Sequence, residues 1–376
     1  MPHVAVALSC LALVGWLYLA FFHGRFWQLL LDGHDTEPAS WPSIDIIVPA
    51  RNESDSLPKT LPSLLAQDYP GMWSIILVDD HSDDSTGDLA RTLAERQSGI
   101  GRLTVVLPPE LADGWVGKVA AMNAGVAHSQ ADYILFTDAD IEHPVDSLRR
   151  LAARALARDL DLTSRMARLR CDSFAERLLV PAFVFFFGML YPFRRANEPR
   201  SRVAAAAGGV MLIRRRALDS IGGLARIKSA LIDDCALAKA VKESGGRIEL
   251  TLTDDISSLR EYPRFTDIHQ TVARTAYTQL RYSPLMLVGT CLGMALLFLL
   301  PPLSLLSGFP LAAGIGFAAW LIMVWIYLPM VRFYKQPAGW ALSLPVAAAI
   351  YIVATIDSAR LHWQGKGGQW KGRAQG

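Results

Sequence analysis

The sequence predicts an α/β domain built on a mostly parallel, Rossmann-like sheet, with a transmembrane anchor before it and a cluster of transmembrane helices after it. Three observations support this prediction. Short apolar runs alternate with amphipathic stretches through the middle of the chain, and long apolar runs lie near both ends. The composition is also too apolar for an ordinary soluble enzyme. Of 376 residues, 52% are hydrophobic and 19% are charged, and the mean hydropathy is +0.25.

The first apolar run, from Val4 to Phe22, is nearly uninterrupted and about long enough to cross the ~30 Å hydrocarbon core of a bilayer. No Lys or Arg precedes it and no small-residue cleavage site ends it cleanly, which favours an uncleaved anchor at 1–24 over a signal peptide. We expect further membrane helices within 284–357, followed by a basic tail at 358–376. The candidate spans are Pro284–Leu306, Phe309–Val331 and a weaker run, Trp340–Ile356.

Positive charge near the spans predicts the orientation. Met1–Leu19 contains no Lys or Arg, whereas four arginines precede the second span, so the central domain should face the cytoplasm. Three C-terminal crossings would then place the basic tail outside. Either the last segment is re-entrant or the rule fails here, and both alternatives stay open. The four arginines are Arg260, Arg264, Arg274 and Arg281.

The central region, 42–282, alternates apolar β-rich runs with helical stretches. Continuous apolar strands separated by amphipathic helices predict a mostly parallel sheet covered on both faces, with ligands beyond the carboxyl ends of its strands. The predicted strands are Ile44–Val48, Ile75–Val78, Leu103–Leu107 and Tyr133–Phe136. The predicted helices are Leu57–Gln67, Gly87–Glu95 and Lys118–His128.

Three of these strands end in acidic loops: Pro49–Glu53, Asp79–Thr86 and Thr137–Asp140. One acidic loop is ordinarily a helix cap, a role we expect for Asp84 or Ser85. Three converging loops would repel one another unless a cation joins them, and Mg²⁺ or Mn²⁺ is the simplest occupant.

Several function classes are excluded. A dinucleotide-binding dehydrogenase would carry G-x-G-x-x-G after the first strand, but Ala50–Ser54 contains no glycine. The net charge of +2 gives no indication of nucleic-acid binding. The four cysteines have no metal-ligand spacing, and a disulfide framework is not expected.

These loops and two further segments together resemble the family 2 glycosyltransferases, which have the GT-A fold. The resemblance runs from about Ile44 to Tyr282 and rests on five elements in the family's order. They are the opening loop Pro49–Glu53, the V-D-D-x-S-x-D-x-T segment Val78–Thr86, the segment Gly114–Gly125 with the G-K-x-x-A-x-N-x-G helix start, the D-x-D at Asp138–Asp140, and the acidic pair Asp233–Asp234.

The resemblance implies an enzyme that uses a nucleotide-sugar donor, with UDP as the expected nucleotide, and Mg²⁺ or Mn²⁺ held by Asp138 and Asp140. Asp234, beside Asp233, is the expected general base of a single inverting displacement. The alternatives without a catalytic role are that this pair only caps a helix and that Lys118 is a solvated surface lysine. The expected donor-binding residues are Pro49, Arg51, Glu53, Asp79, Asp80, Lys118, Asn123, Asp138 and Arg281.

Two departures from the family pattern narrow the expected acceptor. The acidic pair is Asp-Asp where the family usually has Glu-Asp, and Tyr277–Tyr282 falls where polysaccharide synthases carry Q-x-x-R-W, with Gln279 shifted by one place and Tyr282 in place of Trp. This chain therefore looks more like the ceramide glucosyltransferase-like branch, which glycosylates single lipids. Its layout resembles the bacterial hopene-associated glycosyltransferases, which implies a multi-pass protein of the bacterial inner membrane acting on a membrane lipid, with a hopanoid as one candidate and Tyr282 on the acceptor side.

A further apolar segment, Leu178–Phe193, is short for a crossing and is broken by proline and glycine. We interpret 174–196 as an interfacial segment on the acceptor side, with a buried core helix as the alternative. His143 lies near the D-x-D, and local hydrogen bonding is favoured over metal ligation. Two functions compete with a lipid-directed transferase: a processive polysaccharide synthase, and a non-catalytic membrane scaffold that binds nucleotide sugar. Protein partners and the oligomeric state are not predicted.

Overall fold

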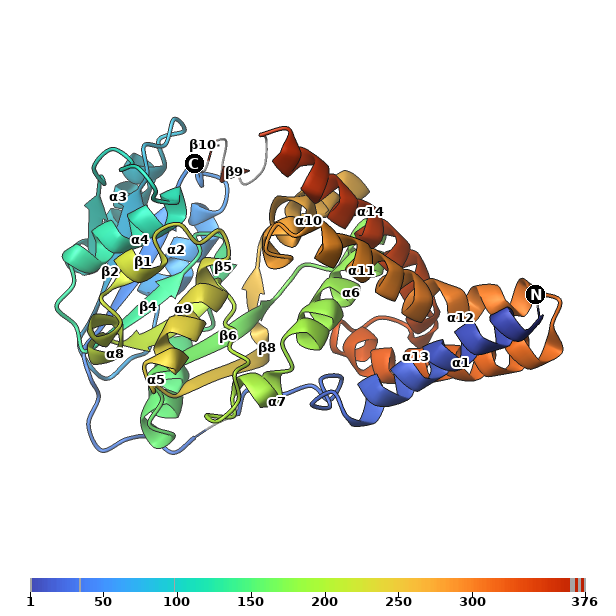
Figure 1. Ribbon diagram of the computed structural model, residues 1–376. Helices are drawn as coiled ribbons and strands as arrows, with labels where there is room; N and C mark the ends of the chain where they lie inside the picture. Colours follow the sequence, from blue (N-terminus) through green and yellow to red (C-terminus); the bar gives the residue numbers. More distant parts are fainter. Residues whose placement is uncertain (1, 34, 98, 366–368, 371–372, 375–376) are drawn as a thin grey trace. The chain divides into compact units, whose positions relative to one another are not determined.

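The computed structural model describes the chain except for residues 1, 34, 98, 366–368, 371–372 and 375–376. The chain forms two compact units, each made of separate segments (Figure 1). The sheet unit comprises Leu30–Leu169, Arg195–Arg260 and Gln369–Gly376. The membrane unit comprises Met1–Leu29, Arg170–Arg194 and Glu261–Gly368. Parts of the basic tail predicted at 358–376, including Lys366 and Lys371, lie outside the described residues.

Among the described residues, eight strands of the sheet unit form one sheet in the order β3-β2-β1-β4-β7-β6-β8-β5. The pairs β1–β2, β1–β4, β2–β3 and β6–β8 are parallel, and β7 runs antiparallel between β4 and β6. The strands are β1 Ile44–Ala50, β2 Trp73–Asp79, β3 Leu103–Val106, β4 Tyr133–Thr137, β5 Ile141–Glu142, β6 Leu162–Arg168, β7 Val210–Arg214 and β8 Ile248–Ser258. A short pair, β9 Gln369–Trp370 and β10 Arg373–Ala374, is separate from this sheet.

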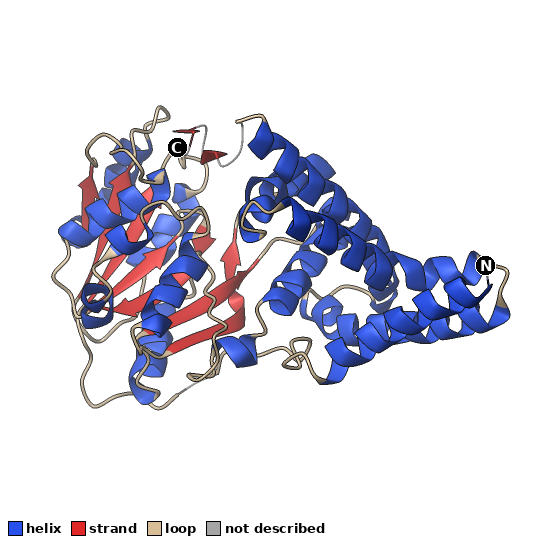
Figure 2. Ribbon diagram, in the orientation of Figure 1, coloured by secondary structure: helices blue, strands red, loops and turns tan. Residues whose placement is uncertain are grey.

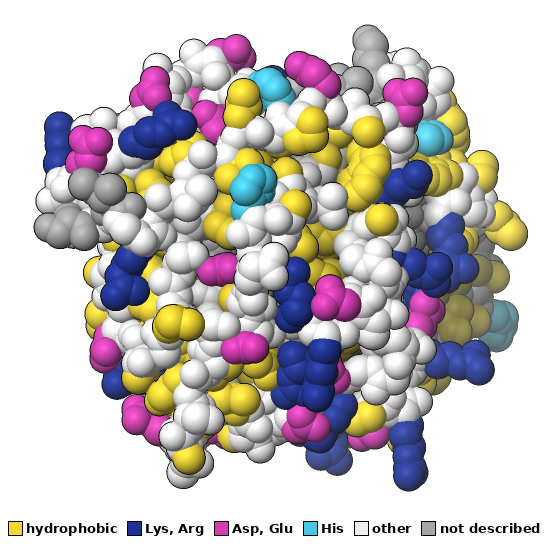
Figure 3. All heavy atoms as spheres, turned by 90° about the vertical axis from the view of Figure 1, so that its left-hand side faces the viewer, with side chains coloured by type: hydrophobic (Ala, Val, Ile, Leu, Met, Phe, Trp, Pro, Cys, Tyr) yellow, Lys and Arg dark blue, Asp and Glu magenta, His cyan; other side chains and the backbone are white. Residues whose placement is uncertain are grey.

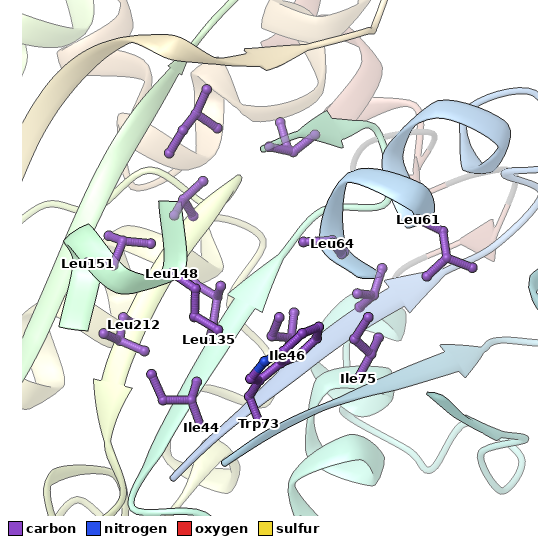
Figure 4. Packing of buried hydrophobic residues seen from close by; sticks show 14 of the residues in the cluster. Ile44, Ile46, Leu61, Leu64, Trp73, Ile75, Leu135, Leu148, Leu151 and Leu212 are labelled. Carbon is purple, nitrogen blue, oxygen red and sulfur yellow. The ribbon is translucent and has the colours of Figure 1, made fainter. Parts of the chain in front are cut away.

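Helices cover both faces of the sheet, as the continuous apolar strands predicted (Figure 2). On one face, side chains of α2 and α5 pack on β1, β2, β4 and β7 (Figure 4). On the other face, a second apolar cluster joins α4 and α9 to the same strands. The helices are α2 Leu57–Leu65, α3 Thr86–Arg96, α4 Gly117–Ala127, α5 Ser147–Ala157, α8 Arg215–Ser220 and α9 Asp233–Glu243.

One glycine sets how closely α4 approaches the sheet. A Cβ added at Gly125 would lie 2.5 Å from Ile47 Cγ2, closer than carbon atoms can pack, and 3.1 Å from Val78 Cγ2, which is a tight contact. Glycine therefore lets the helix backbone rest directly on β1 and β2. Val119 and Met122 of α4 belong to the same apolar cluster as Ile47 and Val78, so the helix packs on these two strands along its length.

The membrane unit is helical, and within its described residues four helical segments are long and apolar enough to cross a membrane: Pro2–Phe21, Pro284–Leu306, Pro310–Phe333 and Ala338–Trp363. They coincide with the four predicted runs, and the weaker fourth run extends to 26 residues. The remaining bounds are α1 Pro2–Phe21, α6 Phe174–Leu190, α7 Phe193–Ala196, α10 Phe265–Gln279, α11 Pro284–Met294, α12 Leu300–Leu303, α13 Pro310–Phe333 and α14 Leu344–Trp363.

The segment expected at the membrane interface forms α6 and packs among the other helices of its unit, in contact with α10, α13 and α14. A capping box starts it, because Ser173 accepts from the backbone N–H of Glu176 and Glu176 accepts from that of Ser173. Most of its apolar side chains are buried, and the Tyr351 hydroxyl of α14 donates to the Leu179 carbonyl. α6 thus has the burial of a core helix, and its depth in a bilayer stays a prediction.

Figure 3 shows a face on which basic and acidic side chains are interspersed, with apolar side chains scattered between them. No large region of one sign dominates this face.

Candidate active site

Three acidic loops meet at one edge of the sheet. β1 lies between β2 and β4 and is parallel to both, and its last residue, Ala50, pairs with Asp79 at the end of β2. β4 ends at Thr137, one residue before the D-x-D. The convergence expected from the sequence is therefore confirmed, because parallel neighbours bring their carboxyl ends to the same edge.

Hydrogen bonds cross-link the loops after β1 and β2. The backbone N–H groups of Asn52, Glu53 and Ser54 donate to the side chains of Ser82, Thr86 and Asp84 at 3.0, 2.9 and 3.0 Å. Asp84 also accepts from the backbone N–H of Thr86, the first residue of α3, whereas Ser85 occupies the N-cap position without a side-chain capping hydrogen bond. Left-handed backbone at three non-glycine positions adds local strain, a feature that clusters at functional sites. These positions are Asn52, His81 and Ser85.

Asp79 and Asp80 have different surroundings. Both carboxylate oxygens of Asp79 accept backbone hydrogen bonds, from Ser82 at 3.2 Å and from Gly87 at 3.1 Å, so this side chain helps to shape the loop. Asp80 is buried, with only 3% of its surface exposed, and lies beside Arg51, whose Nη1 donates to the Asp80 carbonyl oxygen. Arg51 thereby ties the ends of β1 and β2 together.

Lys118 links the D-x-D to the acidic pair. It lies in the first turn of α4, and its Nζ is 2.8 Å from Asp138 Oδ1 and 3.4 Å from Asp233 Oδ2. The side chain is only 16% exposed. Burial acts to lower the pKa of Lys118, but the charges of Asp138 and Asp233 outweigh it and raise that pKa overall. Lys118 is thus a charged, half-buried residue among Asp138, Asp140, Asp233 and Asp234, and we call these five residues the acidic cluster. This position contradicts the alternative of a solvated surface lysine.

Asp234 lies at the start of α9 and is held by the backbone. Its Oδ2 accepts from the Gly208 N–H at 2.9 Å and its Oδ1 from the Cys235 N–H at 2.6 Å. Ile232 occupies the N-cap position of α9 and makes no side-chain capping hydrogen bond, while Asp234 accepts from a backbone N–H of the first turn. Burial, reinforced by the charge of Asp233, raises the pKa of Asp234 to about 6, although Lys118 opposes this.

Asp140 and Asp138 carry the charge of the D-x-D. Burial raises the pKa of Asp140 to about 6, and the charges of Asp138 and Glu53 add to this while Arg260 and Lys118 oppose it. This mutual repulsion among oxygen donors suits a hard divalent cation. Within the described residues no group of three or more His, Cys, Asp or Glu side chains could hold a metal ion. Asp138 and Asp140 can supply one or two carboxylates, the number that Mg²⁺ usually takes from a protein when substrate phosphates complete its coordination.

His143 is a buried member of the core and not part of the acidic cluster. Its Nε2 is 2.9 Å from Thr137 Oγ1 and its Nδ1 is 3.0 Å from Ser147 Oγ. Thr137 Oγ1 in turn donates to the Gly209 carbonyl. Burial lowers the pKa of His143 to about 4, so the ring is neutral at pH 7. The expected local hydrogen bonding is confirmed.

The structure does not bring every predicted residue into this cluster. Pro49 is buried in β1, and Asn123 is half-buried on α4. Arg281 and Tyr282 belong to the membrane unit, where both have left-handed backbone, with φ of 52° and 55°. The Tyr282 ring stacks on His362 of α14, with centroids 4.3 Å apart.

Two residues that act on the acidic cluster were not anticipated. Gly208 holds Asp234 through its N–H, and Arg260 acts on Asp140 through its charge. A sequence signal for Gly208 does exist, because a run of four alanines precedes the Gly208–Gly209 pair just before β7. Such a run of small residues before a strand indicates close approach of the backbone to a ligand or a side chain.

Comparison with known proteins agrees with this geometry. Residues 45–222 match the model of glycosyl transferase family 2. The chain is similar to an N-acetylglucosaminyltransferase of Rhizobium leguminosarum bv. trifolii, with 35% identity over 120 residues, covering 31% of this chain and 63% of that protein. It is also similar to an undecaprenyl-phosphate 4-deoxy-4-formamido-L-arabinose transferase of Salmonella paratyphi A, with 29% identity over 132 residues, covering 35% of this chain and 38% of that protein. The matches thus span less than two thirds of either relative.

A solved structure extends the likeness of the fold to nearly the whole chain. The mannosyltransferase PcManGT from Pyrobaculum calidifontis, in complex with GDP-Man and Mn²⁺, superposes with a TM-score of 0.59 at 19% sequence identity, covering 94% of this chain and 98% of that one. At that identity the likeness shows the fold alone. Over 45–222 this chain is thus similar to the family 2 glycosyltransferases, and its sheet unit has a GT-A-like fold with the acidic loops at one sheet edge.

Proposed function

We propose that this chain is an inverting, metal-dependent hexosyltransferase that moves a sugar from a nucleotide-sugar donor to a membrane lipid. The observation that carries the proposal is the juxtaposition of Asp138 and Asp233 through Lys118, with Asp234 fixed beside them by two backbone N–H groups. The Lys118 ammonium thus joins Asp138, a proposed donor-side acid, to Asp233, the neighbour of the candidate base.

Asp234 is the proposed general base. Its carboxylate accepts the proton of an acceptor hydroxyl while that oxygen attacks the anomeric carbon, and the bond to the nucleoside diphosphate breaks on the opposite face. One displacement inverts the anomeric centre. A pKa of about 6 suits this role, because the group is ionised at pH 7 and still basic enough to take a proton. Asp233 supports it by keeping Lys118 close.

Asp138 and Asp140 are the proposed ligands of Mg²⁺ or Mn²⁺, which would offset the charge developing on the departing diphosphate. Asp80, Arg51 and Glu53 lie at the same sheet edge and are proposed to bind the nucleoside side of the donor, together with Pro49, Asp79 and Asn123. UDP is the expected nucleotide. The structural relative binds GDP-Man, which makes GDP-sugars the other donors to test.

The lipid acceptor is supported by two observations. The membrane unit supplies four helical segments able to cross a bilayer, and the Salmonella relative is named for transfer to undecaprenyl phosphate. The finer proposal, a hopanoid acceptor in a bacterial inner membrane with the catalytic region on the cytoplasmic side, rests on the sequence resemblance. Arg281 and Tyr282 are proposed to contact the donor diphosphate and the acceptor, as that resemblance implies.

The experiment is a donor and acceptor panel. The full chain, purified in detergent, is incubated with UDP- and GDP-sugars and extracted bacterial lipids, with Mn²⁺, Mg²⁺ or EDTA. A glycolipid product that forms only with metal, carries one sugar and has the inverted anomeric configuration supports the proposal. A polymer product would establish the processive synthase instead. Metal-dependent nucleotide binding without turnover on any lipid would favour the scaffold, and no nucleotide binding would refute all three functions.

A further inference from the structure

Lys118 occupies a position where the proposed metal site and the proposed base meet. Its ammonium is in direct contact with Asp138, one of the two proposed metal ligands, at 2.8 Å. It also contacts Asp233, the neighbour of the base, at 3.4 Å. All three side chains are partly shielded from water, with exposures of 16%, 36% and 13% for Lys118, Asp138 and Asp233. Their interactions are therefore screened less than those of surface charges.

The surrounding charge is strongly negative. Five carboxylates lie in or next to the cluster, and the charges that oppose them at Asp140 are those of Arg260 and Lys118. Lys118 also acts on Asp234. The Lys118 ammonium thus offsets negative charge both at the D-x-D and at the Asp233–Asp234 pair. The five carboxylates are Glu53, Asp138, Asp140, Asp233 and Asp234.

A divalent cation on Asp138 and Asp140 competes with this arrangement. The oxygen Asp138 Oδ1 is already paired with Lys118, and a metal ion there would lie within a few ångströms of the ammonium. Like charges at such separation in a half-buried site repel strongly. A bound nucleoside diphosphate would offset the repulsion between the metal ion and the Lys118 ammonium. Its phosphate oxygens would ligate the metal and give the ammonium a new negative partner. Lys118 lies in the first turn of α4, where the helix dipole favours the same anion.

We propose that Lys118 holds the place of the metal cation in the donor-free site, so that the divalent ion binds only together with the nucleoside diphosphate. This inference rests on the proposed function. Gly208 leaves the space for it, since a Cβ at that position would lie 3.1 Å from Lys118 Nζ and 3.4 Å from Asp234 Oδ2. On donor binding, Lys118 leaves Asp138 for a phosphate oxygen and Asp138 becomes free to bind the metal.

The test measures Mn²⁺ binding to the full chain in detergent by electron paramagnetic resonance, without nucleotide and with saturating UDP or GDP. In the wild type, Mn²⁺ alone binds weakly and nucleotide tightens it. Lys118→Met removes the competing charge with little change in length, so Mn²⁺ alone binds roughly tenfold or more tightly, a gain of about 1.4 kcal/mol per tenfold. The tightening of Mn²⁺ by nucleotide shrinks in this variant, and by reciprocity so does the tightening of nucleotide by Mn²⁺.

Two variants control the measurement. Lys118→Arg keeps the positive charge and should bind Mn²⁺ alone as weakly as the wild type does. Lys239→Met removes an equal charge from an exposed position on α9, where Lys239 pairs with Glu243, and should change nothing. A thermal melt confirms that each variant is folded.

If a folded Lys118→Met binds Mn²⁺ alone no better than the wild type, the inference is wrong while the proposed function stands. If the wild type binds neither Mn²⁺ nor nucleotide under any condition, both are wrong.

Discussion

Replacing Asp234 with Asn should separate the chemistry of the site from its structure. The change keeps the size of the side chain and removes the base. Both carboxylate oxygens of Asp234 accept a backbone N–H, from Gly208 and from Cys235. An asparagine carbonyl can serve one of these donors, but its amide NH₂ then faces the other. Leaving one partly buried donor unpaired costs about 1–3 kcal/mol of stability.

The catalytic loss should be larger than this structural cost. A general base contributes about 10²–10⁴-fold to the rate. At about 1.4 kcal/mol per tenfold, this corresponds to roughly 3–5 kcal/mol in the barrier. The loss should appear in kcat, because the proton transfer occurs only in the transition state. Binding of the nucleotide should change little, since Asp234 is not among the residues proposed to hold the donor.

The assay follows transfer from a saturating donor to lipid by the full chain in detergent, beside calorimetric binding of UDP or GDP with Mn²⁺. Asp219→Asn is the matched control: Asp219 is exposed on α8 and outside the acidic cluster, so activity should be unchanged. A folded Asp234→Asn protein that retains more than about a tenth of wild-type kcat would refute the assignment of the base.

The remaining predictions concern pH, metal and packing. Since Asp234 must be ionised to accept a proton and its pKa is about 6, kcat/KM should be flat above that pH and fall tenfold per unit below it. An activity profile that stays flat down to pH 5 would argue against Asp234 as the base. The raised pKa also means that the folded chain binds this proton more tightly than the unfolded chain. The contribution of Asp234 to the free energy of unfolding therefore declines as pH rises from 3.8 to about 6. Asp140→Asn should reduce kcat/KM by about 10²-fold or more and weaken Mn²⁺ binding in the presence of UDP, and unaltered Mn²⁺ binding would exclude Asp140 as a ligand. Gly125→Ala should lower the free energy of unfolding by about 1–3 kcal/mol because its Cβ would lie 2.5 Å from Ile47 Cγ2, whereas Gly101→Ala, which has open space around it, should cost far less; equal denaturation midpoints would contradict the packing argument.

Much of the fold follows from short-range pattern. The strands from Ile44 to Thr137 and the helices between them begin and end within a few residues of the predicted limits, because strong apolar runs are bounded by polar loops. The four candidate spans were equally clear, since length and apolarity suffice to define them. The position of β7, antiparallel between β4 and β6, was not predicted, because strand order depends on contacts between residues distant in sequence.

The grouping of α6 and α10 with the apolar helices was also beyond the sequence pattern. Both fall within 42–282, which was predicted as one catalytic domain, but the structure packs them in the membrane unit. An apolar helix with breaks can lie on a membrane surface or inside a helical bundle. For α6 the choice depends on which neighbouring helices cover it. Two of these, α13 and α14, begin more than a hundred residues after α6 ends, so the local sequence of α6 does not reveal them.

The sequence by itself determined which residue types the site contains and the edge of the sheet where they gather, because parallel strands bring their carboxyl ends together. Only the tertiary structure decided how these groups pair. Lys118 and Asp233 are separated by more than a hundred residues, and only the packing of α4 and α9 on one face of the sheet brings them within 3.4 Å of each other. The same packing sets the burial of Asp234 and its hydrogen bond to Gly208, and therefore its raised pKa. Charge pairing and desolvation depend on distances in the folded chain, and spacing along the sequence does not specify those distances.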